Sequence, residues 1–160
     1  MRIGFGVDSH RFDAAGAGGI TLGGVTIPYE RTLQGHSDAD VVLHALTDAL
    51  LGAIAAPDLG ELFPPTDARW RGAASRLFVE EAMRRVDAGG WAVANVDITV
   101  VTDAPKLTPH KPALRASISR LIAVDESVVS VKAKTTEGLP PAGDGIVAYA
   151  AVLLSKRNAA

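Results

Sequence analysis

Apolar side chains recur at steps of three and four residues in three segments, which is the spacing of helices that bury one face. The segments are 43–54, 73–86 and 114–122. The first is the clearest, because its apolar stripe runs down to Pro57 without interruption. Ser37, with Asp40 three residues later, has the spacing of a capping box and predicts that this first helix begins near Ser37.

Runs of β-branched or alternating residues predict strands at 2–8, 96–101, 127–136 and 146–154. Residues 20–27 predict a hairpin, since a Gly-Gly pair separates two short apolar runs. The order is strand, hairpin, two helices, strand, helix and two strands. It predicts an α+β fold in one domain, 1–160, with helices on one face of a mixed four-stranded sheet and a small hairpin beside it.

The same pattern leaves the second face of the predicted sheet without a covering layer. The strands are rich in Val, Ile and Ala, so this face must be buried by something. We expect the partner to be a further copy of the chain, with the copies packed through their sheets.

Composition narrows the chemistry. Sixteen Lys and Arg against 18 Asp and Glu give a net charge of −2, without a basic arm, so nucleic acid and anionic membranes are not expected partners. The absence of Cys excludes thiolate metal sites and Cys nucleophiles, so any metal must use His and carboxylates. No signal-peptide pattern or membrane-length apolar run is present, and we expect a cytoplasmic protein.

One candidate metal site follows from spacing. Asp8 and His10 lie two apart on a predicted strand and project to the same side, and His44 on the first helix could complete a two-imidazole, one-carboxylate zinc set. Asp40 or Asp48, one turn from His44, could accept its second ring N–H. The alternative is that His10 ends a strand, His44 is a half-buried helix residue, and the acidic row is a solvated face.

A second candidate site lies at the end of the third predicted strand. Lys132, Lys134, Thr135, Thr136 and Glu137 offer cations, hydroxyls and a carboxylate suited to phosphate and Mg²⁺. The alternative is the polar face of an alternating strand. The loop 103–106 also has two interpretations, because its Lys106 could bind phosphate or could be an ordinary solvated side chain.

Taken together, these segments resemble the 2-C-methyl-D-erythritol 2,4-cyclodiphosphate synthases, enzymes of the non-mevalonate route to isoprenoid (terpenoid) precursors. The resemblance runs in order through nearly the whole chain. The matching segments are Arg2 to His10, Gly23 to Pro28, His36 to Leu50, Asp58 to Gly60, Leu62 to Pro64, Ala104 to Lys106 and Lys132 to Glu137.

The resemblance implies a homotrimer with active sites between subunits, and it implies roles at the matching positions. A divalent metal, usually zinc, would be held by Asp8, His10 and His44. His36 and Thr135 would position phosphates and stabilise the transition state, and Glu137 would help to hold a second ion, Mg²⁺ or Mn²⁺, on the substrate diphosphate.

The resemblance also implies a substrate-binding surface in two parts. Residues 37, 58–60 and 63–67 would line a methylerythritol pocket, and 102–108 would hold cytosine and ribose from a neighbouring subunit. The substrate-binding positions are Asp8, Ser9, His10, His36, Ser37, Asp58, Leu59, Gly60, Phe63, Pro64, Pro65, Thr66, Asp67, Thr102, Asp103, Ala104, Pro105, Lys106, Leu107, Thr108, Lys134, Thr135, Thr136 and Glu137.

The implied reaction is that of a phosphorus–oxygen lyase. The 2-phosphate of 4-diphosphocytidyl-2-C-methyl-D-erythritol 2-phosphate attacks the β-phosphorus of the same molecule, which closes the cyclic diphosphate and releases CMP. The nucleophile is already anionic, so the site must supply charge neutralisation and a folded-back substrate rather than a strong base.

Two departures from the family pattern matter. Pro65 stands where the family usually has Asp, and the segment 138–145 is short and lacks the usual Arg, a loss for which Lys132 and Lys134 could compensate. Two rival functions use the same residues: a metal-dependent nucleotide phosphohydrolase and a non-enzymatic metal-binding trimer.

Overall fold

The computed structural model describes residues 1–13, 18–138 and 143–157. Its elements, in chain order, are β1 (Arg2–Arg11), β2 (Ile20–Leu22), β3 (Val25–Ile27), α1 (Val41–Ala53), α2 (Leu59–Leu62), α3 (Arg76–Ala88), β4 (Trp91–Val101), α4 (Lys111–Leu121), β5 (Val129–Lys134) and β6 (Gly145–Lys156). Short 3₁₀ turns lie at Ala68–Trp70, Thr108–His110 and Glu126–Val128.

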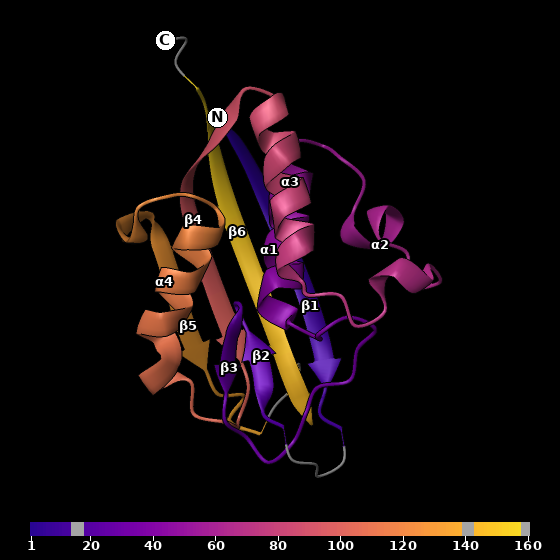
Figure 1. The fold of residues 1–160 in the computed structure, drawn as a ribbon. Coiled ribbons are helices and arrows are strands. Elements are labelled where there is room, and N and C mark those ends of the chain that lie inside the picture. The colour runs from indigo at the N-terminus through magenta and orange to yellow at the C-terminus, as the bar shows by residue number, and fades with distance from the viewer. Residues whose placement is uncertain (14–17, 139–142, 158–160) are drawn as a thin grey trace.

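The four long strands form one mixed sheet in the order β1-β6-β4-β5, and β2 pairs with β3 in a separate hairpin. In this sheet β4 and β5 run parallel, whereas β1–β6 and β4–β6 are antiparallel. The helices α1, α3 and α4 lie on one face of this sheet (Figure 1). The predicted α+β fold is therefore confirmed.

Two glycines bring α1 unusually close to the edge strand β1. A Cβ on Gly4 would lie 1.8 Å from the carbonyl oxygen of Ala49, and one on Gly6 would lie 2.1 Å from that of Ala45. Any side chain at either glycine would therefore push the helix off the strand. This contact fixes the distance between α1 and β1 and therefore the position of α1 relative to the residues of β1 that follow Gly6.

The opposite side of β1 carries the apolar residues of the strand. Ile3, Phe5 and Val7 are 76%, 62% and 45% exposed, and Phe5 stacks on Tyr149 of β6 with 6.3 Å between ring centroids. Alternation along β1 thus places glycine toward the helices and large apolar side chains on the uncovered face.

Several boundaries differ from the sequence prediction. The N-cap of α1 is Asp40 rather than Ser37, because the Asp40 carboxylate accepts the N–H groups of Val42 and Leu43 at 3.2 and 3.1 Å. The helix α3 begins at Arg76, later than predicted, and β4 begins earlier, at Trp91. The segment 58–71, for which no helix or strand was predicted, contains α2 and a 3₁₀ turn.

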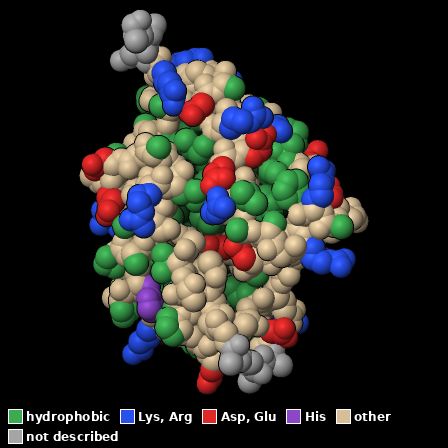
Figure 2. Space-filling view, viewed as in Figure 1, with side chains coloured by type: hydrophobic (Ala, Val, Ile, Leu, Met, Phe, Trp, Pro, Cys, Tyr) green, Lys and Arg blue, Asp and Glu red, His purple; other side chains and the backbone are tan. Residues whose placement is uncertain are grey.

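The helix-covered face carries acidic and basic side chains interspersed with one another (Figure 2).

Across the described ranges, no helix has both the length and the apolar composition required to cross a membrane.

Candidate active site

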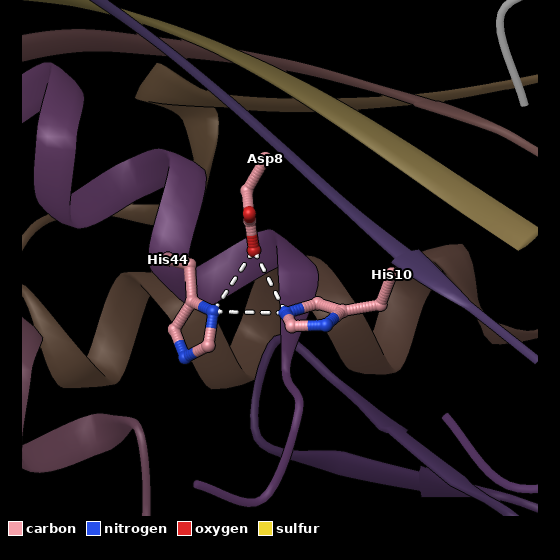
Figure 3. Close-up of side chains that lie close together, drawn as sticks. All are labelled: Asp8, His10 and His44. Atoms are coloured by element: carbon pink, nitrogen blue, oxygen red, sulfur yellow. Dashed lines mark hydrogen bonds and ion pairs between the residues drawn. The ribbon is translucent and has the colours of Figure 1, made fainter. Parts of the chain in front are cut away.

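Asp8, His10 and His44 meet at the contact between β1 and α1 (Figure 3). The Asp8 Oδ2 atom lies 3.0 Å from His10 Nε2 and 2.9 Å from His44 Nδ1, and the two ring nitrogens are 3.2 Å apart. Period-two alternation puts Asp8 and His10 on the same side of the strand, and the Gly4 and Gly6 contacts hold the helix that carries His44 against them.

This triangle fits a divalent metal. A tetrahedral ion bound at about 2.0–2.2 Å keeps its ligand atoms roughly 3.3–3.5 Å apart, close to the separations found here. Two imidazoles and one carboxylate form the donor set, and all three residues line a cavity, which leaves a fourth position facing that cavity.

The second nitrogen of each ring is also bonded. His10 Nδ1 lies 2.6 Å from the carbonyl oxygen of Gln34, which can only accept, so Nδ1 carries hydrogen and Nε2 is free toward the triangle. His44 Nε2 lies 2.9 Å from Ser75 Oγ and 3.0 Å from Ser37 Oγ. These contacts orient both rings so that one nitrogen of each faces Asp8.

The prediction that Asp40 or Asp48 accepts from His44 is wrong. Asp40 lies at the helix cap, where its carboxylate also accepts the N–H groups of Gly23 and Gly24 at 2.8 and 2.7 Å. Asp48 accepts the N–H of Leu59 at 2.8 Å and so joins α1 to α2. The second ring nitrogen of His44 instead faces the hydroxyls of Ser37 and Ser75, and no local spacing indicates Ser75 because it lies 31 residues away.

Burial and charge act against each other in this centre. Burial alone raises the pKa of Asp8, but the hydrogen bonds and charges of His10 and His44 outweigh it, and the pKa lies well below its usual range. Burial lowers the pKa of His10, yet Asp8 raises it overall. Burial raises the pKa of Asp40 to about 6, although the backbone N–H groups that bond its carboxylate act to lower it.

The cavity beside the triangle has a volume of about 250 Å³. Its lining consists of Asp8, His10, His36, Ser37, His44, Leu59, Gly60, Phe63, Pro65, Trp70 and Phe78. Most of these residues were predicted from the sequence. Pro65, at the departure from the family pattern, is part of the wall.

Trp70 and Phe78 are lining residues that sequence reasoning missed. The centroid of the Phe63 ring lies 4.6 Å from that of Phe78 and 5.1 Å from that of Trp70, which it meets edge-on. The centroid of Phe78 lies 5.9 Å from that of the His44 ring. The cavity therefore has one apolar aromatic wall and one wall of imidazole, carboxylate and hydroxyl groups.

Five predicted positions of the same groups do not line this cavity: Ser9, Asp58, Pro64, Thr66 and Asp67. Ser9 is exposed and lies on the opposite face of β1, since it alternates with Asp8 and His10. Asp58 caps α2 by accepting the N–H of Glu61, and Asp67 pairs with Arg69 at 2.6 Å.

A second cavity of about 350 Å³ opens where β4 and β5 end. Its lining consists of Thr102, Asp103, Pro105, Lys106, Leu107, Thr108, Ala133, Lys134 and Thr135. Thr135 donates to the carboxylate of Glu137, while Asp103 accepts the N–H and the hydroxyl of Thr136 at 2.8 and 2.5 Å. Ala104, Thr136 and Glu137 adjoin this cavity without lining it.

Lys132 is placed elsewhere than the sequence suggested. Its ammonium group donates to Asp97 at 2.6 Å, so within the chain Lys132 is paired across neighbouring strands instead of lying in the cavity with Lys134. Residues 139–142 of the short loop fall outside the described residues, so the predicted effect of its missing Arg stays a prediction.

The two cavities share no lining residue. One lies at the β1 edge of the sheet and the other at the β5 edge, which are three strand spacings, roughly 14 Å, apart. Within the described part of one chain, His36 and Thr135, the two predicted catalytic residues, therefore line different cavities.

Comparison with known proteins gives consistent matches. The YgbB family model matches residues 1–155. Proteins named 2-C-methyl-D-erythritol 2,4-cyclodiphosphate synthase are 50% identical over 159 residues in Koribacter versatilis (98% of this chain, 99% of that protein) and 51% over 161 in Cronobacter sakazakii (99% and 100%). A solved structure of a synthase of that name, in a CDP-bound form, has 44% identity and a TM-score of 0.89 over 96% of this chain and 100% of its own.

Proposed function

The chain belongs to the YgbB family, and we propose that it carries out the cyclodiphosphate synthase reaction with the Asp8–His10–His44 centre as its metal site. The enzyme converts 4-diphosphocytidyl-2-C-methyl-D-erythritol 2-phosphate to 2-C-methyl-D-erythritol 2,4-cyclodiphosphate and releases CMP. The observation that carries the metal assignment is the triangle of donor atoms, whose spacing and ring orientation suit one divalent ion.

The bound metal supplies a Lewis acid for a phosphate oxygen. Asp8, His10 and His44 would hold it, and zinc is the proposed ion because imidazole and carboxylate ligands in a tetrahedral set suit it. His36 and Ser37 line the same cavity and would bind phosphate oxygens, and the aromatic wall would pack against the carbon skeleton of the substrate.

The second cavity supplies the complementary half of the proposed site. Lys106 and Lys134 line it and can neutralise phosphate charge, and Thr135 offers a hydroxyl for the transition state. Glu137, bonded to Thr135, offers a carboxylate oxygen for the second ion, Mg²⁺ or Mn²⁺. The loop 102–108 would hold the cytosine and ribose.

A homotrimer would join the two halves. The exposed row Ile3, Phe5 and Val7 gives each copy an apolar sheet face to bury, and the separation of the two cavities requires the second half of each site to come from another chain. We place this single-domain enzyme, 1–160, in the cytoplasm, acting in isoprenoid precursor biosynthesis.

The test is product analysis by ³¹P NMR with the purified enzyme, the cytidine substrate and defined metals. The expected products are the cyclic diphosphate and CMP in equal amounts, with activity lost after chelation and restored by added Zn²⁺ and Mg²⁺. Free phosphate or a linear diphosphate would instead indicate a phosphohydrolase. Full activity in chelated, metal-free protein would contradict the metal centre.

A further inference from the structure

A line of hydrogen bonds leads from His44 away from the proposed metal. Ser75 Oγ lies 2.9 Å from His44 Nε2, and the Ser75 hydroxyl donates to Asp38 Oδ1. The backbone N–H of Ser75 donates to the other oxygen, Asp38 Oδ2, at 3.0 Å. Ser75 is completely buried and its bond to His44 lies in the interior, whereas Asp38 is partly buried.

The direction of the donors follows from the valence of each group. When His44 Nδ1 binds a metal, the remaining ring hydrogen is on Nε2 and needs an acceptor. Ser75 has one hydroxyl hydrogen, and the Asp38 carboxylate only accepts. The Ser75 hydroxyl must therefore accept from His44 and donate to Asp38, which satisfies every group in the line.

We propose that Asp38 and Ser75 are positioning residues that hold the His44 ring for metal binding. The proposal rests on the proposed metal function of Asp8, His10 and His44. Asp38 reaches the ring through Ser75: it fixes the orientation of the Ser75 hydroxyl, which in turn presents its oxygen to the ring. Asp38 Oδ1 also accepts the N–H of Asp40 at 3.3 Å. Neither residue lines the cavity beside the metal site.

The surrounding backbone supports this arrangement. The N–H of Gly72 donates to the carbonyl oxygen of His36 at 2.7 Å, and the N–H of Asp38 donates to that of Ala73 at 3.1 Å. The segment before α3 is therefore tied to the segment before α1. The Ser37 hydroxyl, 3.0 Å from His44 Nε2 and 3.4 Å from Ser75 Oγ, is a second acceptor available when Ser75 is removed.

The test measures Zn²⁺ affinity of the metal-stripped full-length protein against a competing chelator. We expect Ser75→Ala and Asp38→Ala each to raise the Kd about 10–100-fold, the usual effect of losing an outer partner of a metal-binding His. The Ser37→Ala/Ser75→Ala double variant should lose more than Ser75→Ala. Ser119→Ala removes an equally buried hydroxyl from α4, where it donates to Ala116, and should leave the Kd unchanged.

A double-mutant cycle distinguishes positioning from general destabilisation. Because Asp38 acts through Ser75, Asp38→Ala should add less than about threefold in Kd once Ser75 is Ala. Additive effects, or a Ser75→Ala Kd within twofold of wild type, would overturn the proposal while leaving the metal site intact. A wild-type protein that binds no Zn²⁺ would overturn the metal assignment and this proposal with it.

Discussion

The two cavities are built in different ways. The cavity at β1 is assembled within one chain: its imidazoles have hydrogen-bond partners on both nitrogens, and a glycine-mediated contact fixes the helix against the strand. The cavity at the ends of β4 and β5 is formed by the end of β5 and the loop that follows β4. Its Thr135–Glu137 bond is exposed, whereas the bond from Thr102 to Gly145 is buried.

This difference separates metal binding from catalysis. Hydrogen bonds to Gln34 and Ser75 hold the rings of His10 and His44, two of the proposed metal ligands, before any ligand binds, so we expect that one chain can bind the metal. In the second cavity the Thr135 hydroxyl is held only by an exposed bond to Glu137, and the cavity lies at the other edge of the sheet. One chain alone should therefore bind metal and fail to turn over substrate.

The largest expected effect is that of His44→Ala. Without this proposed ligand the site would no longer hold a metal charge beside the phosphates, so we expect CMP release to fall roughly thousandfold together with Zn²⁺ binding. His110→Ala, in a 3₁₀ turn outside both cavities, is the control and should keep wild-type values. A His44→Ala enzyme within tenfold of wild type would show that the triangle is not the metal site.

Phe5→Glu tests whether the apolar sheet face joins the two halves. Phe5 is 62% exposed on that face, and a charge buried between copies would prevent assembly. We expect a monomer in analytical ultracentrifugation, at least a hundredfold loss of turnover, and unchanged Zn²⁺ affinity. Leu77→Glu places the same charge at an exposed apolar position of α3 and should remain a trimer. A trimeric, active Phe5→Glu protein would show that the subunit interface does not include this sheet face.

Mixing two inactive variants tests whether the halves come from different chains. Trimers refolded from equal amounts of His44→Ala and Thr135→Ala chains should recover about a quarter of wild-type turnover, because one site in four then combines two intact halves. Each variant refolded alone is the control. Recovery no greater than the parent variants would mean that both halves belong to one chain.

The smallest effects concern two carboxylates that accept backbone N–H groups and have opposite pKa shifts, Asp40 and Asp103. Burial raises the pKa of Asp40 from the usual 3.8 to about 6, so its contribution to the free energy of unfolding should fall as pH rises through that range. The hydrogen bonds from Thr136 lower the pKa of Asp103, so its contribution is present above pH 3.8 and is lost as pH falls below it.

Melting temperatures of the metal-free proteins measure this contrast. Relative to Asp40→Asn, the wild type should gain stability as the pH is lowered from about 6 to about 4; relative to Asp103→Asn, it should lose stability as the pH is lowered toward about 3. If both differences changed in the same direction, the buried and the exposed carboxylate would not differ as described.

Much of this architecture could be predicted from the sequence. Apolar spacing predicted the helices and strands, and the alternation of β1 correctly placed Asp8 and His10 on one side. Boundaries were less accurate, as at Ser37, where the capping-box spacing was present but Asp40 caps the helix. Asp40 is outside the helical backbone, so its side chain turns back to the N–H groups instead of stacking above His44.

The sequence alone determined what is local: the period of each element, the placing of Asp8 and His10 on one side of a strand, and the presence of apolar side chains on a sheet face that no helix of the chain covers. The tertiary structure decided what depends on packing between distant segments. Gly4 and Gly6 allow α1 to approach β1, and Ser75 reaches His44 from before α3. Such contacts depend on where elements meet in space, because the spacing within each element is the same whichever neighbour it packs against.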